Sequence, residues 1–534
     1  MKSTKSKPAI VFLLIMSVLI VQGCFPSKRA VPVNTNSLRT RESVTTPAKV
    51  FLRDSSLVIF NQGFSISGDS VEGMGTRYWL THHDSLQTQR IPVNGIAAVT
   101  SYEKNQTEGM LIGSGLMAIT GAIMAPLSIY CLSCPKCCFG SCPTVFTTDG
   151  KRYALEAELF SYSLSKFFQD TDTDRIIQKP AADGTFTIRL TNEALETHYI
   201  NQFNLLAVRH DAGTEVYPTP EGGTAVVKKL HAPMEALDSE GGNISSLISR
   251  RDTSWVTGIS TRFDEAENSK ARDWLDMKLA VPDSAKQATL VLRLRNSLLS
   301  TVLFYDVVLA SQGVGALEWN HRLNTDSLYA AFYHMAYSQF AGIEVEAKSS
   351  GGTWKQIASF GDVGPLAWKE LALQLPVVRD ENGEMWIRLQ WFPENFIIDY
   401  AGYDYGTYKT PEIEQVNPKS ITDHRSRLMN EIWQQVEYSD GEFLTTYPGD
   451  SYYFYYVIPD RPETTTTLFL KSKGYYTEWL RGNWISRRNR DYTFNLFEED
   501  KTLEQLKRSW RADRELLERT FFQTRIPLKE RQLK

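Results

Sequence analysis

Apolar and polar residues alternate along much of the chain, as in β-strands that face a core on one side and solvent on the other. The alternation begins over residues 49–105, in five short runs separated by turn sequences such as Asn61-Gln62-Gly63 and Asn94-Gly95. Short strands joined by tight turns predict a small β-barrel-like domain. The fold class that we expect is therefore mainly β.

Three further β-rich sections follow. Residues 143–245 begin with a hairpin that turns at Asp149-Gly150. Residues 246–405 alternate like the strands of a β-sandwich, and their order resembles galactose-binding-like jelly rolls. The run 301–311 is one of the strands that we expect there. Residues 406–485 form a β-rich section with aromatic residues on both faces.

The end of the chain, residues 486–534, changes to helical spacing. Residues 501–534 carry ten Lys or Arg and five Asp or Glu, which makes the tail basic in an acidic protein. We predict an amphipathic helix docked on the surface, and contact with anionic lipid or a partner is the alternative. The apolar positions of this helix are Leu503, Leu506, Trp510, Leu517 and Phe521.

Residues 1–23 predict a lipoprotein signal peptide. Three lysines precede an apolar run over residues 9–21, which is too short to span a bilayer comfortably. The run ends in Val21-Gln22-Gly23-Cys24, which resembles the lipobox of bacterial lipoproteins, in which the cysteine is acylated. Cys24 is the predicted lipidation site, and a plain signal peptide is the alternative.

The residues after Cys24 bear on where the protein is held. In lipoproteins, an Asp directly after the acylated cysteine resembles an inner-membrane retention signal. This chain has Phe at that position, residue 25, which favours sorting to the outer membrane. Residues 24–48 are rich in Pro, Ser, Thr and Asn, which predicts a flexible tether. We therefore expect a protein of the bacterial cell envelope, anchored by lipid.

A second apolar segment, residues 110–130, contains no charged residue and is long enough for a transmembrane helix. Ser114, Ala118 and Ala122 have the spacing that lets helices approach closely in lipid. Several glycines and Pro126 weaken the helix. A membrane span, insertion at the bilayer interface and a hairpin buried between domains all stay open.

Residues 106–142 join this segment to a cysteine cluster. An exported compartment permits disulfides, although five cysteines leave one thiol over. Zinc has enough thiolates but lacks two well-separated pairs of ligands, and an iron–sulfur cluster would need a slightly different spacing. We favour disulfides or mixed thiols, with zinc or an iron–sulfur cluster as alternative cofactors. The cysteines are Cys131, Cys134, Cys137, Cys138 and Cys142.

Three other groups invite a ligand interpretation. His82-His83 falls in a strand pattern, where neighbouring side chains point to opposite faces and cannot easily bind one ion. Asp170, Asp172 and Asp174 imitate the start of a calcium loop but lack its glycine and final acid, so we predict a solvated acidic turn. Four tryptophans form either a sugar-binding platform or, as we favour, part of a core. They are Trp354, Trp368, Trp386 and Trp391.

Composition narrows the class of function. The 534 residues include 58 Lys or Arg and 62 Asp or Glu, which gives a net charge of −4 and argues against nucleic acid as a partner. The sequence lacks the motifs of serine hydrolases of the nucleophile-elbow type, zinc proteases, P-loop proteins and dinucleotide-binding proteins.

The segment CPTVFTTDGKRYALEAELFSYS, which begins at Cys142, is similar to a motif of uncharacterised bacterial lipoproteins, C-P-x-V-[YF]-x-x-D-G followed by an aromatic and an acidic residue. The resemblance extends in order from about residue 49 to 480 and implies an architecture and an envelope address, with no catalytic residue. It departs at the cysteine cluster, where that group usually has the single Cys-Pro pair. Further matching stretches begin at Gly184, Asp273, Val363, Ile387 and Lys471.

These observations lead to two hypotheses of function. The first is a lipid-anchored envelope protein that acts as a non-enzymatic binding or scaffold module. It would contact the bilayer through Cys24 and, in one interpretation, through residues 110–130, with a glycan or an envelope protein as its unidentified ligand. The alternative is an envelope enzyme or redox protein that uses the Cys131–Cys142 cluster or a carboxylate cleft.

Overall fold

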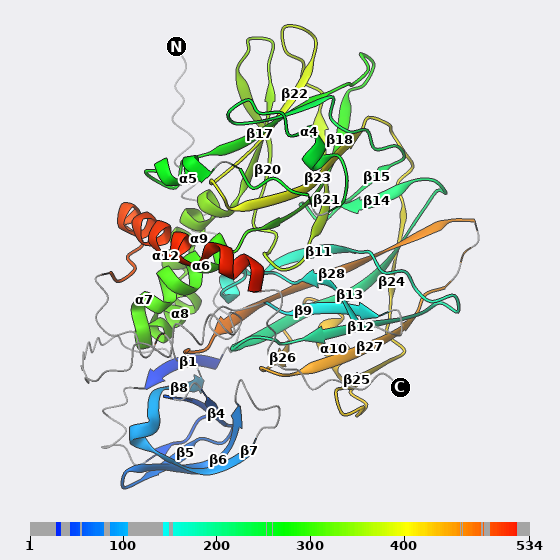
Figure 1. The fold of residues 1–534 in the computed structure, drawn as a ribbon. Coiled ribbons are helices and arrows are strands. Elements are labelled where there is room, and N and C mark those ends of the chain that lie inside the picture. Colours follow the sequence, from blue (N-terminus) through cyan, green and yellow to red (C-terminus); the bar gives the residue numbers. More distant parts are fainter. Residues whose placement is uncertain are drawn as a thin grey trace, which may run out of the picture. The chain divides into compact units, whose positions relative to one another are not determined.

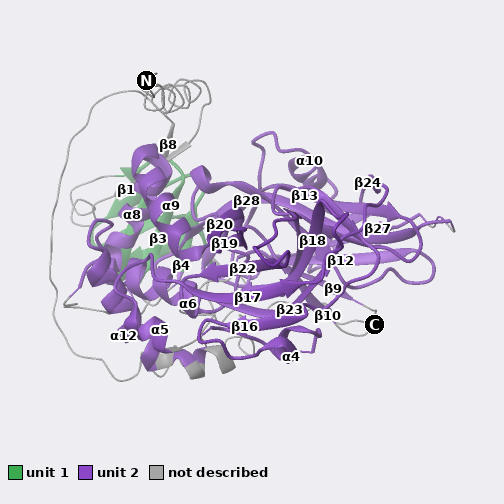
Figure 2. Cartoon of the chain, turned by 90° about the horizontal axis from the view of Figure 1, so that it is seen from above, with its two compact units in different colours: residues 1–52, 57–77, 86–122 green, residues 53–56, 78–85, 123–534 purple. Residues whose placement is uncertain are grey.

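The computed structural model describes residues 28–33, 43–53, 56–78, 86–104, 142–148, 153–252, 254–258, 260–459, 461, 463–481, 484 and 492–520. Its sheets are antiparallel, which confirms the mainly β fold class (Figure 1). Predictions that concern Cys24, His82-His83, residues 110–130 and the four cysteines from Cys131 to Cys138 lie outside the described residues. The chain divides into two compact units (Figure 2).

The first unit is built around one eight-stranded, barrel-like sheet with the order β1-β8-β3-β4-β6-β5-β2, and β7 pairs with β6. Gly63 turns the chain at a φ of +78°, where a Cβ atom would lie 1.9 Å from the carbonyl oxygen of Val44. The strands are β1 (Lys28–Val33), β2 (Ser43–Val44), β3 (Ala48–Leu52), β4 (Leu57–Phe60), β5 (Phe64–Ser67), β6 (Ser70–Tyr78), β7 (Leu86–Pro92) and β8 (Ile96–Lys104), with the turn η3 (Val93–Gly95) before β8.

The predicted tether, residues 24–48, is wrong where β1 and β2 lie. β1 pairs with β8 along its whole length, and β2 pairs with β5. β1 and β2 lie at the two ends of the sheet order, so each pairs with a neighbour on one side only. Such edge strands can have a polar sequence with little apolar alternation, and the sequence pattern therefore did not predict them.

The second unit contains a first β-sandwich whose two sheets have the orders β10-β9-β12-β27-β25 and β11-β28-β13-β24, with β26 beside β13. Both sheets bury aliphatic and aromatic side chains in one shared core. The strands are β9 (Thr144–Thr148), β10 (Tyr153–Glu158), β11 (Asp170–Ile176), β12 (Thr185–Thr191), β13 (Glu196–His210), β24 (Glu412–Val416), β25 (Ser420–Asp423), β26 (Leu444–Thr446), β27 (Ser451–Val457) and β28 (Thr465–Glu478).

Residues 143–245 and 406–485 are therefore not two separate modules. β12 pairs with β27, and β13 pairs with β28 over fourteen residue pairs from Glu196–Glu478 to His210–Thr465. Sequence alternation cannot reveal this, because it identifies strands and not their partners. The smaller elements of this part are η4 (Lys166–Phe168), β14 (Glu215–Pro218), β15 (Thr224–Val227) and α10 (Ile432–Val436).

A second β-sandwich is inserted between the halves of the first. Its sheets have the orders β16-β17-β22-β19-β20 and β21-β18-β23, and all of its strands except β16 lie within residues 246–405, where we expect a β-sandwich. β17 and β22 alternate strictly between buried and half-buried residues, so one face lies in the core and the other faces outward. The strands are β16 (Glu235–Asp238), β17 (Asp273–Leu279), β18 (Gln287–Asn296), β19 (Ile343–Lys348), β20 (Trp354–Phe360), β21 (Lys369–Pro376), β22 (Met385–Trp391) and β23 (Phe396–Asp404).

A group of helices interrupts this sandwich between β18 and β19, and the predicted strand over 301–311 is wrong. A short apolar run without alternation is compatible with either structure, and here it is helical. The helices are α6 (Leu299–Val302), the π-helix η5 (Leu303–Leu309), α7 (Ala310–Gln312), η6 (Gly313–Gly315), α8 (Ala316–Thr325) and α9 (Ser327–Ala341); α4 (Ser245–Ile248) and α5 (Ser260–Glu265) precede them.

Helical residues Leu299–Thr325 are the one run in the described part of the chain that is long and apolar enough to cross a membrane. Its most apolar window is 67% buried within the protein. Many of its side chains, including Leu299, Val302 and Val307, belong to a core that also contains residues of the C-terminal helix. We therefore interpret this run as a core helix.

The C-terminal helix α12 (Glu499–Thr520) confirms the predicted amphipathic helix. Leu503, Leu506, Trp510 and Leu517 are all buried against the helical core. Arg514 also forms an ion pair with Glu394 at 2.7 Å. The apolar face is thus used for docking on the protein, while Phe521 lies outside the described residues.

Candidate functional site: a buried polar centre

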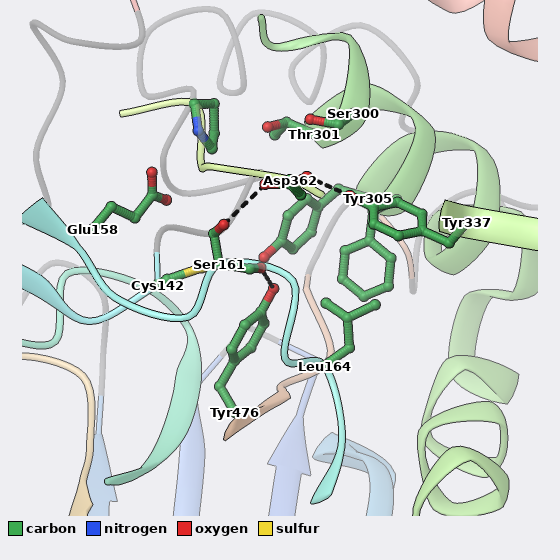
Figure 3. Close-up of a pocket in the computed structure, with 12 residues that line it drawn as sticks. Cys142, Glu158, Ser161, Leu164, Ser300, Thr301, Tyr305, Tyr337, Asp362 and Tyr476 are labelled. Atoms are coloured by element: carbon green, nitrogen blue, oxygen red, sulfur yellow. Dashed lines mark hydrogen bonds between the residues drawn. The ribbon is translucent and has the colours of Figure 1, made fainter. Parts of the chain in front are cut away.

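Several segments that carry the lipoprotein resemblance meet at one small cavity of the second unit (Figure 3). Cys142 lies just before β9, Glu158 ends β10, and Tyr476 lies near the end of β28. The space that the centre of a water molecule can occupy in this cavity is about 30 Å³, so the cavity has room for one or two water molecules. It is lined by Cys142, Glu158, Ser161, Leu164, Ser300, Thr301, Phe304, Tyr305, Tyr337, Asp362, Pro365 and Tyr476.

Asp362 organises one side of the cavity. Its two carboxylate oxygens accept hydrogen bonds from the hydroxyl groups of Ser161 at 3.0 Å and Tyr337 at 2.8 Å, and Oδ1 also accepts from the backbone N–H of Gly364 at 2.8 Å. Burial raises the pKa of Asp362 above its usual value. Asp362 thereby connects the loop after β20 to helix α9 and to the segment after β10.

Glu158 fixes the same loop from the other side. Its Oε2 accepts a hydrogen bond from the backbone N–H of Leu366 at 2.8 Å. Gly364 has a φ of +87°, and a Cβ atom there would lie 2.7 Å from Glu158 Oε2. A side chain at position 364 would push the carboxylate away, so this glycine permits the close approach.

A second carboxyl pair lies deeper. Glu196 and Glu478 are directly opposite each other on β13 and β28, and both side chains are almost completely buried. The Tyr305 hydroxyl oxygen is 2.9 Å from Glu196 Oε1 and 2.6 Å from Glu478 Oε1. A phenol has one hydrogen, so one of these two contacts needs a proton from a carboxyl group.

The charges around this pair explain where that proton resides. Burial and then the neighbouring Glu196 raise the pKa of Glu478 to about 8, so Glu478 is largely protonated at neutral pH. Arg481 Nη2 donates to Glu478 Oε2 at 2.7 Å and lies 3.5 Å from Glu196 Oε1. Burial lowers the pKa of His198 to about 3, so a neutral imidazole faces Glu196 Oε2 at 3.1 Å.

Cys142 is a thiol in this setting. Burial, and then the charges of Glu158 and Glu196, raise its pKa well above the usual value. Its Sγ–H donates to the carbonyl oxygen of Ser161 at 3.4 Å, and the Tyr476 hydroxyl donates to the same oxygen at 2.7 Å. A neutral, buried thiol is a poor nucleophile and a poor metal ligand.

No group of three or more His, Cys, Asp or Glu side chains with metal-binding geometry occurs within the part of the chain that the structure describes. The predicted disulfide, zinc and iron–sulfur alternatives depend on Cys131, Cys134, Cys137 and Cys138, which lie outside that part. They stay predictions.

The predicted calcium-like turn is a strand. Asp170, Asp172 and Asp174 lie in β11, which pairs with β28. The ammonium group of Lys369 contacts both Asp172 and Asp174, the latter at 3.0 Å. The polar alternation that looked like a solvated turn reflects a strand that forms ion pairs with β21 of the second sandwich.

The four predicted tryptophans do not form one platform. Trp391 is completely buried in the core of the second sandwich, so it cannot meet a ligand from solvent. Trp368 contacts Arg293 and Arg295, with guanidinium carbons 4.7 and 5.3 Å from its ring centre. Trp354 and Trp386 lie on the outward face of the five-stranded sheet, at the half-buried positions of β20 and β22.

That outward face carries a ladder of cations and aromatic rings, which sequence reasoning missed at Trp274. The guanidinium carbon of Arg388 lies 4.6 Å from the ring centre of Trp274 and 4.2 Å from that of Trp354. Arg262 lies 4.2 Å from the Trp274 ring. Arg388 is held by two hydrogen bonds to Asp276, at 2.7 and 2.8 Å. The ring of Trp274 thus stacks on arginines of the protein itself.

Sequence reasoning predicted Cys142 as a disulfide or metal candidate, whereas Glu158, Glu196, Tyr476 and Glu478 fell within the matching stretches without an assigned role. It missed other members of the polar centre completely, because each is a single polar residue in an ordinary helix or loop sequence. Those residues are Tyr305, Tyr337, Asp362 and Arg481.

No protein family matches the chain, and no curated protein is similar to it in sequence. Among solved structures, the secreted serine protease VesC from Vibrio cholerae aligns with 71% of this chain and 70% of its own, at 8% identity and a TM-score of 0.13. So low a score carries no argument about fold or activity.

Proposed function

We propose that this protein is a lipid-anchored component of the bacterial cell envelope, attached through Cys24 and acting as a non-enzymatic scaffold or binding module. The anchor rests on the lipobox-like sequence Val21-Gln22-Gly23-Cys24 and on the resemblance to bacterial lipoproteins. Two or three acyl chains on one cysteine hold a protein stably on a membrane. The Phe at position 25 favours the outer membrane.

The observation that carries the scaffold role is the buried polar centre. Its carboxyl, hydroxyl and thiol groups contact one another and the backbone, and its cavity of about 30 Å³ has room for one or two water molecules. The centre joins β9, β10, β13 and β28 to the helices and to the loop after β20. These contacts support the proposal that the polar centre fixes the geometry of the second unit.

Acyl labelling of the expressed chain tests the anchor. The Cys24→Ser variant should lose incorporation of a clickable fatty acid, whereas the Cys142→Ser variant should keep it, because Cys142 is buried. Labelling is the informative readout, since residues 110–130 could keep an unacylated chain on the membrane. Equal labelling of the two variants would refute the proposal.

The binding version has its own test. A glycan array probed with the full Cys24→Ser chain should give signals that weaken in a Trp386→Ala variant if the outward sheet face binds sugar. Lys278 and Lys348 approach the Trp386 ring less closely than the arginines approach Trp274, at 5.8 and 6.0 Å. A silent array removes the sugar version and leaves a protein partner.

A second candidate function, an envelope enzyme, is favoured by the buried carboxyl pair. Glu478 is an acid with a pKa near neutrality beside a second carboxyl group, which is the electrostatic arrangement of many acid–base catalysts. It would require the second unit to open. Hydrolysis of envelope polymers by the purified chain, abolished in Glu478→Gln and kept in Glu442→Gln, would replace the scaffold proposal.

A further inference from the structure

Helix α9 (Ser327–Ala341) presents an apolar ridge on its exposed side. Its sequence SLYAAFYHMAYSQFA has no charged residue over 15 positions. Leu328 is 64% exposed, Phe332 43% and Met335 55%. These three residues have the spacing i, i+4, i+7, so they lie along one side of the helix. A surface helix of a water-facing protein normally places charged residues there.

The opposite side of α9 fixes the helix on the protein. Ala330, Tyr333 and Phe340 are buried, and the Tyr337 hydroxyl donates to Asp362 in the polar centre. The N-terminus is capped by Asp326, whose side chain accepts from the backbone N–H of Tyr329 at 3.0 Å. The exposed ridge is therefore held in a defined position.

Basic and aromatic residues border the N-terminal end of the ridge. The guanidinium carbon of Arg322 lies 3.9 Å from the ring centre of Tyr329. The turn η4 packs beside α8 and α9 through a hydrogen bond from the Lys166 backbone N–H to Asn324 at 3.0 Å. Lys166 is exposed, and the neighbouring Phe167 is 38% exposed. Apolar side chains rimmed by Lys, Arg and Tyr are typical of segments that lie at a membrane interface.

The size of the ridge bears on what covers it. A 15-residue helix is about 22 Å long, so its face offers much less than the roughly 800 Å² per partner of a stable protein interface. A short apolar ridge is sufficient to insert among lipid head groups.

We propose that the exposed face of α9, formed by Leu328, Phe332 and Met335, inserts into the interfacial layer of a lipid bilayer. The inference rests on the proposed lipid anchoring and adds an orientation to it. The anchored protein would lie with α9 against the membrane, with Lys166 and Arg322 at the level of the phosphate groups. The anchor and α9 would then act as two attachment points, which together bind far more strongly than either alone.

Site-specific photocrosslinking in the envelope of expressing cells tests this orientation. The acylated full chain would carry benzoylphenylalanine in place of Leu328 or, as a matched control, in place of Leu428, which is also a leucine and also 64% exposed. We expect a phospholipid adduct at position 328 and none at 428. A protein adduct at 328, no adduct, or equal lipid adducts at both positions would overturn the inference.

Vesicle binding gives a second, independent readout. The chain from residue 24 would carry Cys24→Ser together with Leu116→Asp and Ile123→Asp, so that neither the acyl anchor nor residues 110–130 hold it on the vesicles, and it would be floated with phosphatidylethanolamine and phosphatidylglycerol vesicles. In this background we expect Leu328→Glu with Met335→Glu to weaken binding by about tenfold or more, and Leu428→Glu to leave it unchanged. Unchanged binding of the double variant would contradict the inference. Acyl labelling of Cys24 is measured separately, so failure of the anchor and failure of α9 insertion remain distinguishable.

Discussion

At the scale of single residues, the polar centre shows how burial decides protonation. Burial raises the pKa of Glu478 to about 8 and lowers the pKa of His198 to about 3, because the surrounding charges do not fully replace the hydration that each charged form has in water. Both side chains are therefore mainly neutral at pH 7. Tyr305 contacts both carboxyl groups, and the pair holds together only while one proton is shared among these oxygens. The centre is therefore sensitive to pH.

The first prediction concerns Glu478→Gln. The folded pKa of Glu478 is about 8 and its ordinary value 4.5, so the folded state keeps a proton that the unfolded state releases between these values. Stability conferred through Glu478 therefore falls as the pH rises from about 4.5 to 8. Because glutamine does not titrate, the free energy of unfolding of the variant should rise relative to that of the wild type by about 5 kcal/mol as the pH increases over this range.

Denaturant titrations of the two proteins near the two ends of this pH range measure the effect. Glu442→Gln, at an exposed position, provides the control and should show a difference independent of pH. The same pH-independent difference for Glu478→Gln would contradict the shared-proton arrangement.

The second prediction concerns the reactivity of Cys142. In a chain with Cys131, Cys134, Cys137 and Cys138 replaced by serine and Cys24 acylated, Cys142 is the remaining free thiol. We expect alkylation in the folded protein to be slower than in denaturant by at least about a hundredfold, since the thiol is buried and its pKa is raised. Equal rates in both conditions would restore Cys142 as a redox or nucleophilic candidate.

Sequence reasoning reached this scale only partly. It identified Cys142 as a candidate residue from the neighbouring cysteines and from the Cys-Pro pair, but it did not predict that Cys142 lies in a buried polar centre. Asp362 and Tyr305 become important only because a loop and a π-helix bring them to strands more than 100 residues away in sequence, as the Tyr305–Glu196 separation of 109 illustrates. No local pattern encodes such a meeting.

At the scale of elements, alternation predicted strands well where one sheet face is outward. β17 and β22 follow it strictly. β22 was among the expected strands, whereas the sequence of β17 was noted only as a stretch that matches the lipoprotein group. It failed at η5, where continuous apolar residues fit a buried helix and a buried strand equally well. It also failed at β11, where polar residues line a strand because they pair with Lys369 and Glu370.

The third prediction tests the ladder on the outward sheet face. Arg388→Lys should lower the free energy of unfolding by about 1–2 kcal/mol, because lysine cannot form two parallel hydrogen bonds to Asp276 or stack flat between Trp274 and Trp354. Arg461→Lys, whose side chain is 46% exposed in a surface ion pair, should cost less than about 0.5 kcal/mol. Thermal or denaturant unfolding measures both. A loss at Arg388 no greater than at Arg461 would show that the ladder contributes little.

At the scale of the whole molecule, the second unit contains one β-sandwich whose sequence is inserted into that of another, and buried ion pairs connect the two. Lys369 on β21 of the inserted sandwich contacts Asp172 and Asp174 on β11 of the outer one. Burial raises the pKa of Asp174 to about 7 even with this lysine present. The two sandwiches should therefore depend on each other for stability.

The fourth prediction follows from that dependence. Lys369→Met leaves two buried carboxyl groups without their cation and should cost about 3–5 kcal/mol. Adding Asp172→Asn and Asp174→Asn should restore part of the loss, because no uncompensated charge is left. Circular dichroism and tryptophan fluorescence report the unfolding of both sandwiches. Full stability of Lys369→Met alone would contradict the coupling.

The pairing of β13 with β28 also determines when the molecule can be completed during synthesis. The Trp479 indole donates to Thr197 across 282 residues of sequence, and the whole inserted sandwich emerges between these two strands. Closing so long a loop is slow, and the outer sandwich has an open sheet until the last strands arrive. A chain that ends before β28 would expose that edge to proteases and chaperones, so this protein should survive in the cell only as a finished product.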